Sequence, residues 1–238
     1  MNGPYGLEVS DSCQTCKLRG SKSFCQLSPA AVKDFDAIKS TTTYPAGSVL
    51  FVEQQDPRGA FVLCAGKAKL TMSSSGGKTL IVRIAKPGEA LGLMATMTGS
   101  PYEATAETIY PSQVVFIRRD DFLRFVAEHP DMYHAVIEHL GKLYSGACEQ
   151  LRTVGLSGSA REKLARLLLD WSAEGRETQQ GTQITVPLTH EEIAEFAGTT
   201  RETITRTLSE FRAKNFVKLH GSIMMISNRP ALETIVGI

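Results

Sequence analysis

Hydrophobic and polar positions follow two different patterns along this chain of 238 residues. From Tyr44 to Ile117 the apolar runs are short and rich in Val, Ile, Leu and Phe, and Gly, Pro, Ser or Asp bounds each run. Such runs predict antiparallel strands with tight connections. The paired glycines of the segment SSSGGK supply the positive φ that a hairpin turn needs. We therefore expect a small closed or double-sheet β-roll.

After Arg118 the pattern becomes helical. The segment PDMYHAVIEHLGKLYSGACEQLRTV carries an apolar stripe at helical spacing: Val136, Leu140, Leu143, Ala147, Leu151 and Val154. Such a stripe indicates a helix that packs lengthwise, either on the same helix of a second chain or on its own β-roll. Tyr, His, Glu and Lys flank the stripe as they would at a seam between two chains, so we favour a homodimer.

Two short helices are predicted within residues 188–227. A capping box at Thr189 and Glu192 opens the first helix, and Gly198 ends it. Thr199 or Thr200 caps the second helix. The inward face of the second helix is apolar: Ile204, Leu208 and Phe211. Two helices joined by a glycine-containing turn predict a helix-turn-helix, whose second helix enters the major groove of DNA.

The outward side of this second helix carries side chains suited to reading DNA. Arginine presents two donors that match O6 and N7 of guanine, and glutamate can accept from N4 of cytosine. The whole chain has a formal charge of only +1, but the residues from Thr200 to His220 form a basic stripe. The segment FVKLHGSIMMIS predicts a hairpin wing. The predicted DNA-binding residues are Thr200, Arg201, Glu202, Thr205, Arg206 and Lys218.

The chain resembles the CRP/FNR family of bacterial transcription regulators in the β-roll segments YPAGSVLFVEQQ, FVLCAGKAKL and PGEALGL and in the helix TRETITR. The resemblance implies an α+β fold with an N-terminal cyclic-nucleotide-binding-like β-roll, a long dimerisation helix and a C-terminal winged helix-turn-helix. It also implies a homodimer that binds a palindromic site on double-stranded DNA and works with RNA polymerase. With Arg201, Glu202 and Arg206 at the family's base-reading positions, each half-site would be of the TGTGA type.

Four parts are expected along the chain: an N-terminal cysteine-containing arm (1–29), a β-roll sensor domain (30–128), a dimerisation helix (129–156) and a winged helix-turn-helix DNA-binding domain (157–238). No stretch approaches the roughly 20 apolar residues of a membrane span. The start, MNGPYGLEVSDS, lacks the basic patch and the apolar run of a secretion signal. We therefore expect a cytoplasmic location and no membrane contact.

The family resemblance also bears on the ligand of the β-roll. In cyclic-nucleotide-binding members, an arginine after the Gly-Glu pair contacts the ligand phosphate, a contact that is hard to replace. Here the segment from Pro87 to Ile117 holds no Arg and no Lys, and Glu89, Glu103 and Glu107 would repel a phosphate. We therefore do not expect a cyclic nucleotide as the ligand.

Three of the five cysteines lie close to the N-terminus, in the segment SCQTCKLRGSKSFCQL. This arrangement resembles the cysteine cluster of FNR-type oxygen sensors, which hold a [4Fe-4S] cluster with one further cysteine in the β-roll. A short loop with three thiolates can cover one face of such a cluster. Cys64 and Cys148 are the candidates for the fourth ligand, and Cys64 is preferred because it lies in the roll. The predicted cluster ligands are Cys13, Cys16, Cys25 and Cys64.

Other interpretations of the signal remain open. The CxxC pair could be half of a zinc site or a redox-sensitive pair of thiols. The same regulator could instead sense a small organic ligand through a pocket lined by Met94, Met97 and Tyr102, although core packing explains these residues equally well. An enzyme is not expected, because no histidine precedes His129 and neither a nucleophile elbow nor a phosphate-binding glycine loop occurs.

Overall fold

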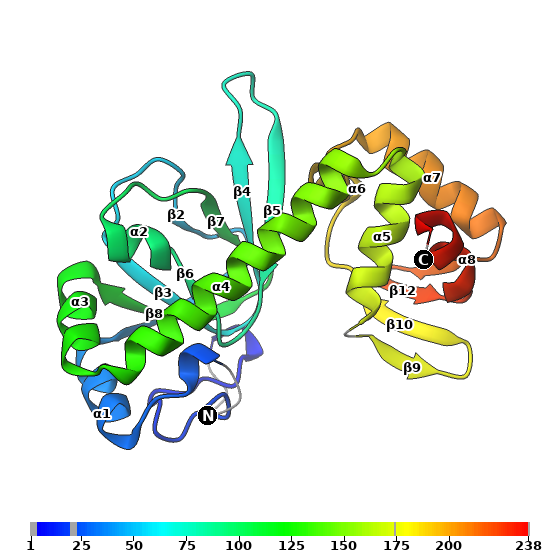
Figure 1. The fold of residues 1–238 in the computed structure, drawn as a ribbon. Helices are drawn as coiled ribbons and strands as arrows, with labels where there is room; N and C mark the ends of the chain where they lie inside the picture. The colour runs from blue at the N-terminus through cyan, green and yellow to red at the C-terminus, as the bar shows by residue number, and fades with distance from the viewer. Residues whose placement is uncertain (1–3, 20–22, 174, 238) are drawn as a thin grey trace. The chain divides into compact units, whose positions relative to one another are not determined.

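The computed structural model describes residues 4–19, 23–173 and 175–237 (Figure 1). The chain divides into two compact units. The N-terminal unit comprises Met1–Gly77 and Val82–Ala147, and the C-terminal unit comprises Lys78–Ile81 and Cys148–Ile238. Within the described ranges, none of the helices combines the length and the apolar character needed to cross a bilayer.

The N-terminal unit is a β-roll of two four-stranded sheets. The strand order is β1-β8-β3-β6 in one sheet and β2-β7-β4-β5 in the other. Described pairs such as β1 with β8 and β4 with β7 are antiparallel, as the short apolar runs predict. The strands are β1 (Ser40–Tyr44), β2 (Val49–Phe51), β3 (Gly59–Ala65), β4 (Ala68–Ser73), β5 (Thr79–Ala85), β6 (Ala90–Leu91), β7 (Thr105–Thr108) and β8 (Ser112–Arg118). The β-roll prediction is confirmed.

Helices pack against the β-roll and complete its core. They are α1 (Pro29–Ile38), α2 (Leu93–Thr98), α3 (Arg119–Glu128) and α4 (Asp131–Leu151). Helix α1 begins where Ser28 accepts a hydrogen bond from the Ala31 N–H, with a proline in the first turn. One core cluster joins Phe24 of the arm, Phe35 of α1, Phe122 of α3 and Val136 of α4. The arm is therefore part of the packed unit.

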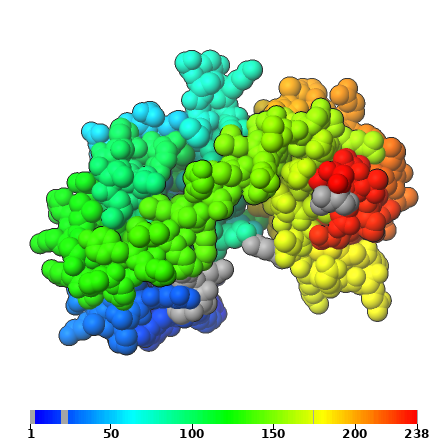
Figure 2. All heavy atoms as spheres, in the orientation of Figure 1, coloured from blue at the N-terminus to red at the C-terminus, as the bar shows by residue number. Residues whose placement is uncertain are grey.

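Helix α4 has two apolar faces. Val136 is only 3% exposed and packs with Met132 and Ala135 in the core of its own unit, so its assignment to a seam between two chains is wrong. The apolar residues that are exposed recur at spacings of four and seven, and we call them the outer face of α4: Tyr133, Ile137, Tyr144 and Leu151. In Figures 1 and 2, α4 lies at the surface of the N-terminal unit.

The C-terminal unit contains the predicted helix-turn-helix and a four-stranded sheet of order β11-β12-β10-β9. Its strands are β9 (Arg176–Thr178), β10 (Gly181–Thr185), β11 (Val217–His220) and β12 (Ile223–Ile226). Its helices are α5 (Ala160–Ser172), α6 (His190–Ala197), α7 (Arg201–Ala213) and α8 (Arg229–Val236). Strands β11 and β12 pair antiparallel and form the predicted hairpin wing after α7.

The turn between α6 and α7 has the predicted local chemistry. Thr189 and Glu192 form a capping box at the start of α6, and the Thr200 side chain caps α7. Gly198 ends α6 with a φ of +60°, and a Cβ at this position would lie 2.7 Å from a methyl carbon of Val154. A larger residue would therefore be strained and crowded at the turn.

Candidate functional site

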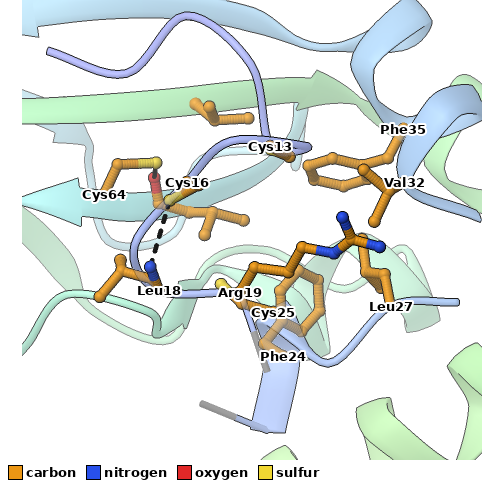
Figure 3. A pocket seen from close by; sticks show the side chains of 12 residues that line it. Cys13, Cys16, Leu18, Arg19, Phe24, Cys25, Leu27, Val32, Phe35 and Cys64 are labelled. Carbon is orange, nitrogen blue, oxygen red and sulfur yellow. Dashed lines mark hydrogen bonds between the residues drawn. The ribbon is translucent and has the colours of Figure 1, made fainter. Parts of the chain in front are cut away.

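Four of the five cysteines line one pocket in the N-terminal unit (Figure 3). Cys13 and Cys16 come from the arm, Cys25 from a short 3-10 helix (Ser23–Cys25) and Cys64 from strand β3. The other lining residues are mainly apolar: Leu18, Arg19, Phe24, Leu27, Val32, Phe35, Val62 and Val115. The structure thus brings together the four cysteines that the sequence predicts as ligands, while Cys148 lies on α4.

All five cysteines are free thiols. Within the described part of the chain, no group of three or more His, Cys, Asp or Glu side chains is arranged to hold a metal ion. Burial, with added repulsion from the Cys16 and Cys13 thiolates, raises the pKa of Cys25 to about 12. Burial and the same kind of repulsion from the other three also raise the pKa of Cys64 to about 12. The four thiols are therefore within electrostatic reach of one another.

Asp36 and Lys39 hold the Cys13 loop against α1. Asp36 accepts hydrogen bonds from the Cys13 N–H at 2.9 Å and from the Ser12 hydroxyl at 2.6 Å. Lys39 Nζ lies 2.8 Å from the Asp36 carboxylate and 3.5 Å from Cys13 Sγ. Burial opposes the charge on Asp36, but hydrogen bonds from Lys39, Ser12 and Cys13 lower the pKa of this carboxyl to about 2. Sequence reasoning missed this pair, because a lysine after a helix is usually exposed to solvent.

Phe24 connects the cysteine pocket to α3 and α4. Its side chain is 1% exposed, stacks on Phe122 with 6.3 Å between ring centroids, and meets the edge of His139 at 5.9 Å. His139 Nε2 donates to the Ala90 carbonyl at 3.0 Å, and burial is the main cause that lowers the pKa of this imidazole. Because Phe24 directly precedes Cys25, a displacement of Cys25 would disturb the packing of α4.

Two glutamates in the segment from residue 87 to residue 117 form ion pairs within the N-terminal unit. Glu89 forms an ion pair with Arg83 of β5, and Glu107 lies 3.4 Å from Lys69 Nζ of β4. Both basic residues come from strands that precede the segment 87–117 considered in the sequence. These ion pairs partly offset the repulsion that Glu89 and Glu107 would exert on a phosphate. That no cyclic nucleotide binds stays a prediction.

The residues suggested to line an organic-ligand pocket are dispersed. Tyr102 is 2% exposed, stacks on Phe51 with 4.2 Å between ring centroids and donates its hydroxyl proton to the Gly59 carbonyl at 2.7 Å. Met94, in contrast, is 44% exposed, and Met97 packs against the core cluster that contains Phe24. Tyr102 is therefore a core residue of the β-roll.

The predicted DNA-reading side chains of the recognition helix, α7, are exposed to solvent. On this helix they are Arg201, Glu202, Thr205 and Arg206. The residues that anchor the opposite side are at most 1% exposed: Ile204, Leu208 and Phe211. Positions one, four and five residues apart lie on one side of a helix, so the four polar side chains share one face.

Two further predicted DNA-binding residues lie outside this face, Thr200 at the start of α7 and Lys218 on the wing. Thr200 accepts a hydrogen bond from the Thr203 N–H at 3.3 Å and thereby fixes the start of α7. Thr205 Oγ1 lies 3.0 Å from Nδ1 of His190 on α6, so this hydroxyl is already engaged within the protein. Lys218 is exposed on strand β11 of the wing. All six residues of the predicted set are thus accessible in the C-terminal unit.

Comparisons with known proteins agree with this arrangement. The cyclic nucleotide-binding domain model matches residues 41–129, and the Crp-like helix-turn-helix domain model matches residues 162–235. The transcriptional activatory protein AadR of Rhodopseudomonas palustris is 28% identical over 207 residues, which cover 86% of this chain and 85% of that protein. The CRP-like cAMP-activated global transcriptional regulator of Mycobacterium tuberculosis is 24% identical over 211 residues, covering 88% and 93%.

A solved structure shows the same fold. FixK2 from Bradyrhizobium japonicum superposes with a TM-score of 0.73 at 18% identity, over 83% of this chain and 97% of that chain. The two domain models together cover more than half of the sequence, in the order that the family requires. The chain belongs to the CRP/FNR family of transcriptional regulators.

Proposed function

We propose that this protein is a homodimeric DNA-binding transcription regulator that responds to oxygen or redox state through a [4Fe-4S] cluster. The proposed ligands are Cys13, Cys16, Cys25 and Cys64. One observation carries this proposal: these cysteines, which lie between positions 13 and 64 of the sequence, line a single pocket. Clusters of this type are held by four cysteine thiolates.

The residues around the pocket suit such a group. Apolar side chains from the arm, α1, β3 and β8 form most of the wall, which limits contact with water. Arg19 in the lining and Lys39 behind Cys13 supply positive charge. A bound cluster would supply a redox-active, oxygen-labile centre. Because the thiols of Cys25 and Cys64 have raised pKa values, ligand binding by these residues must release protons.

The alternatives receive less support from the same residues. A sensor based on thiol oxidation needs a reactive thiolate, and burial raises the pKa of Cys13 in the CxxC pair as well as the pKa values of Cys25 and Cys64. An organic ligand beside Tyr102 would have to displace a core side chain that is 2% exposed. A zinc ion would use the same four cysteines, so metal analysis must separate zinc from iron.

The outer face of α4 supports the proposed homodimer. Its members Ile137, Tyr144 and Leu151 are each at least 67% exposed and recur every seven residues, which is the repeat of a two-helix seam. Cys25 reaches the same helix through Phe24 and His139. A change at the pocket can therefore alter the pairing of α4 and, with it, the spacing of two recognition helices about one turn of DNA apart.

On DNA, the exposed face of α7 is the proposed reading surface. Arg201, Glu202 and Arg206 are proposed to contact base edges of a palindromic site with TGTGA-type half-sites. Thr200, Thr205 and Lys218 are proposed to complete the interface, and RNA polymerase is a proposed partner on the promoter. Selection of bound oligonucleotides tests the reading surface, because recovery of sites without G-rich palindromic half-sites would contradict it.

Protein purified without air tests the signal. Iron, acid-labile sulfide, zinc and the ultraviolet–visible spectrum are measured for the wild type and for two single variants, Cys64→Ser and Cys148→Ser. We expect iron and sulfide in the wild type and in Cys148→Ser, and loss of most of both in Cys64→Ser. A colourless wild type without iron and sulfide would overturn the cluster, and zinc in its place would identify a structural metal.

A further inference from the structure

Lys39 is a buried cation whose position depends on three acceptors around its ammonium group. The Lys39 side chain is only 6% exposed, although lysine is rarely buried unless it is paired. Nζ lies 2.8 Å from an Asp36 carboxylate oxygen, 2.9 Å from the Asp11 carbonyl oxygen and 3.5 Å from Cys13 Sγ. An ammonium has three N–H donors, so these three contacts use all of its hydrogen-bonding capacity.

Lys39 and Asp36 form an ion pair beside Cys13. The Asp36 carboxylate also accepts from the Cys13 N–H and the Ser12 hydroxyl, so Lys39 shares it with two other donors. The third acceptor of Lys39 is a sulfur atom that carries a negative charge only when Cys13 is a thiolate, as in a metal ligand. Because Nζ lies 3.5 Å from Cys13 Sγ, the charge of Lys39 would act directly on this sulfur when it ligates a metal.

We infer that Lys39 is a positioning residue of the proposed cluster site: its ammonium group helps to hold the Cys13 loop against α1 and offsets the negative charge of the bound cluster, while Asp36 opposes the charge effect. This inference rests on the proposed function. Lys39 touches the ligand from the side of α1 and acts on the cluster only through Cys13. Partners of metal ligands in this position tune both the retention of the metal and its reduction potential.

Electrostatics gives the two residues opposite effects on the potential. Removing the positive charge of Lys39 makes it harder to add an electron to the cluster, so the midpoint potential of Lys39→Met becomes more negative. Removing the negative charge in Asp36→Asn makes the addition easier, so the midpoint becomes more positive. A purely structural role of this group would loosen Cys13 in both variants and would not produce shifts of opposite sign.

The experiment uses full-length protein purified without air. Midpoint potentials are measured by titration with dithionite through mediator dyes, and iron loss is followed as transfer to a chelator under argon. We expect Lys39→Met to lose iron roughly tenfold faster than the wild type, with a more negative midpoint, and Lys39→Arg to recover most of both properties. Lys33→Met, at an exposed position on the same helix, is the matched control and should behave like the wild type.

Three results would overturn the inference. Wild-type rates and potentials in Lys39→Met, with a cluster present, contradict the role of Lys39 and leave the proposed function intact. Shifts of the same sign in Lys39→Met and Asp36→Asn show a structural role only. A wild type without iron and sulfide instead overturns the proposed function, and this inference with it. Thermal melts of each apo-protein show whether a variant has lost its fold.

Discussion

The cysteine pocket and the helix α7 differ in how their candidate functional residues lie relative to the hydrophobic core. Cys13, Cys25 and Cys64 are partly buried and pack against the main core cluster of the N-terminal unit. Arg201 and Arg206 project into solvent from a helix whose other side is anchored by buried Ile204 and Leu208. In the pocket the proposed ligands therefore touch the stabilising residues, whereas on α7 the proposed DNA-reading residues and the buried anchors occupy opposite faces of one helix.

This difference predicts how each region responds to substitution. A change beside the pocket removes packing as well as chemistry, because the same side chains serve both. A change on the exposed face of α7 removes contacts to DNA and leaves the folded unit almost unaffected, since surface substitutions usually alter stability by no more than about 0.5 kcal/mol. The two regions can therefore be separated by measuring stability and DNA affinity on the same variants.

The largest expected effect on stability is that of Phe24→Ala. Phe24 is 1% exposed between Phe122 and His139, so its truncation should lower the free energy of unfolding of the N-terminal unit by about 3–5 kcal/mol. Urea unfolding of the apo-protein followed by circular dichroism measures this change. The fluorescence of the single tryptophan, Trp171 on α5, reports the C-terminal unit and should keep its wild-type midpoint. An unaltered circular dichroism midpoint would show that Phe24 does not join the arm to the core.

Arg206→Ala should weaken DNA binding and leave the stability of the fold unchanged. Loss of a two-donor contact to a guanine costs about 1–3 kcal/mol of DNA-binding free energy and relaxes the preference at that base pair. The melting temperature should stay at the wild-type value, because Arg206 is exposed. Binding to a TGTGA-type palindrome and to single-base variants of it measures the effect. Arg212→Ala, in the last turn of the same helix, is the matched control, and an equal loss for both variants would contradict base reading by Arg206.

His139 of α4 should make the stability of the N-terminal unit depend on pH. Burial lowers the pKa of His139 below the ordinary value of 6.5, so the unfolded chain binds a proton at a higher pH than the folded chain does. The stabilisation is complete above pH 6.5 and declines as the pH falls below it, towards the pKa of the folded state. His139→Gln keeps a donor for the Ala90 carbonyl, and this part of the pH dependence should disappear. Melts of the apo-protein between pH 8 and pH 5 test this, and parallel curves for both proteins would contradict it.

Local chemistry made the helix-turn-helix predictable from the sequence. The capping box at Thr189 and Glu192, the positive φ of Gly198 and the cap at Thr200 each depend on neighbours within a few residues. Helix α4 shows the limit of this reasoning. Its apolar residues form two faces, and spacing alone could not tell that Val136 packs on the β-roll while Ile137 is exposed.

The cysteine pocket could be located only from the tertiary structure. The sequence could not decide whether Cys64 is a ligand or a small core residue, because the choice depends on how β3 lies beside an arm that is distant in the chain. Lys39 and Asp36 gave no sequence signal, since a charged pair three residues apart near the end of a helix usually lies in solvent. Only the position of the Cys13 loop over α1 brings this pair into contact with a proposed ligand.

The smallest expected effect is that of a substitution in the wing. It tests whether the exposed residues of the C-terminal unit include a phosphate-contacting side chain beside the base-reading ones. Lys218 is exposed on β11, and a lysine that contacts a phosphate binds all sequences alike because phosphates carry no sequence information. Lys218→Gln should therefore weaken specific and non-specific binding by the same factor and reduce the slope of log affinity against log salt by about 1. Titrations on the TGTGA-type site and on unrelated DNA over a range of salt measure both quantities. A loss confined to the specific site would instead make Lys218 a base-reading residue like Arg206.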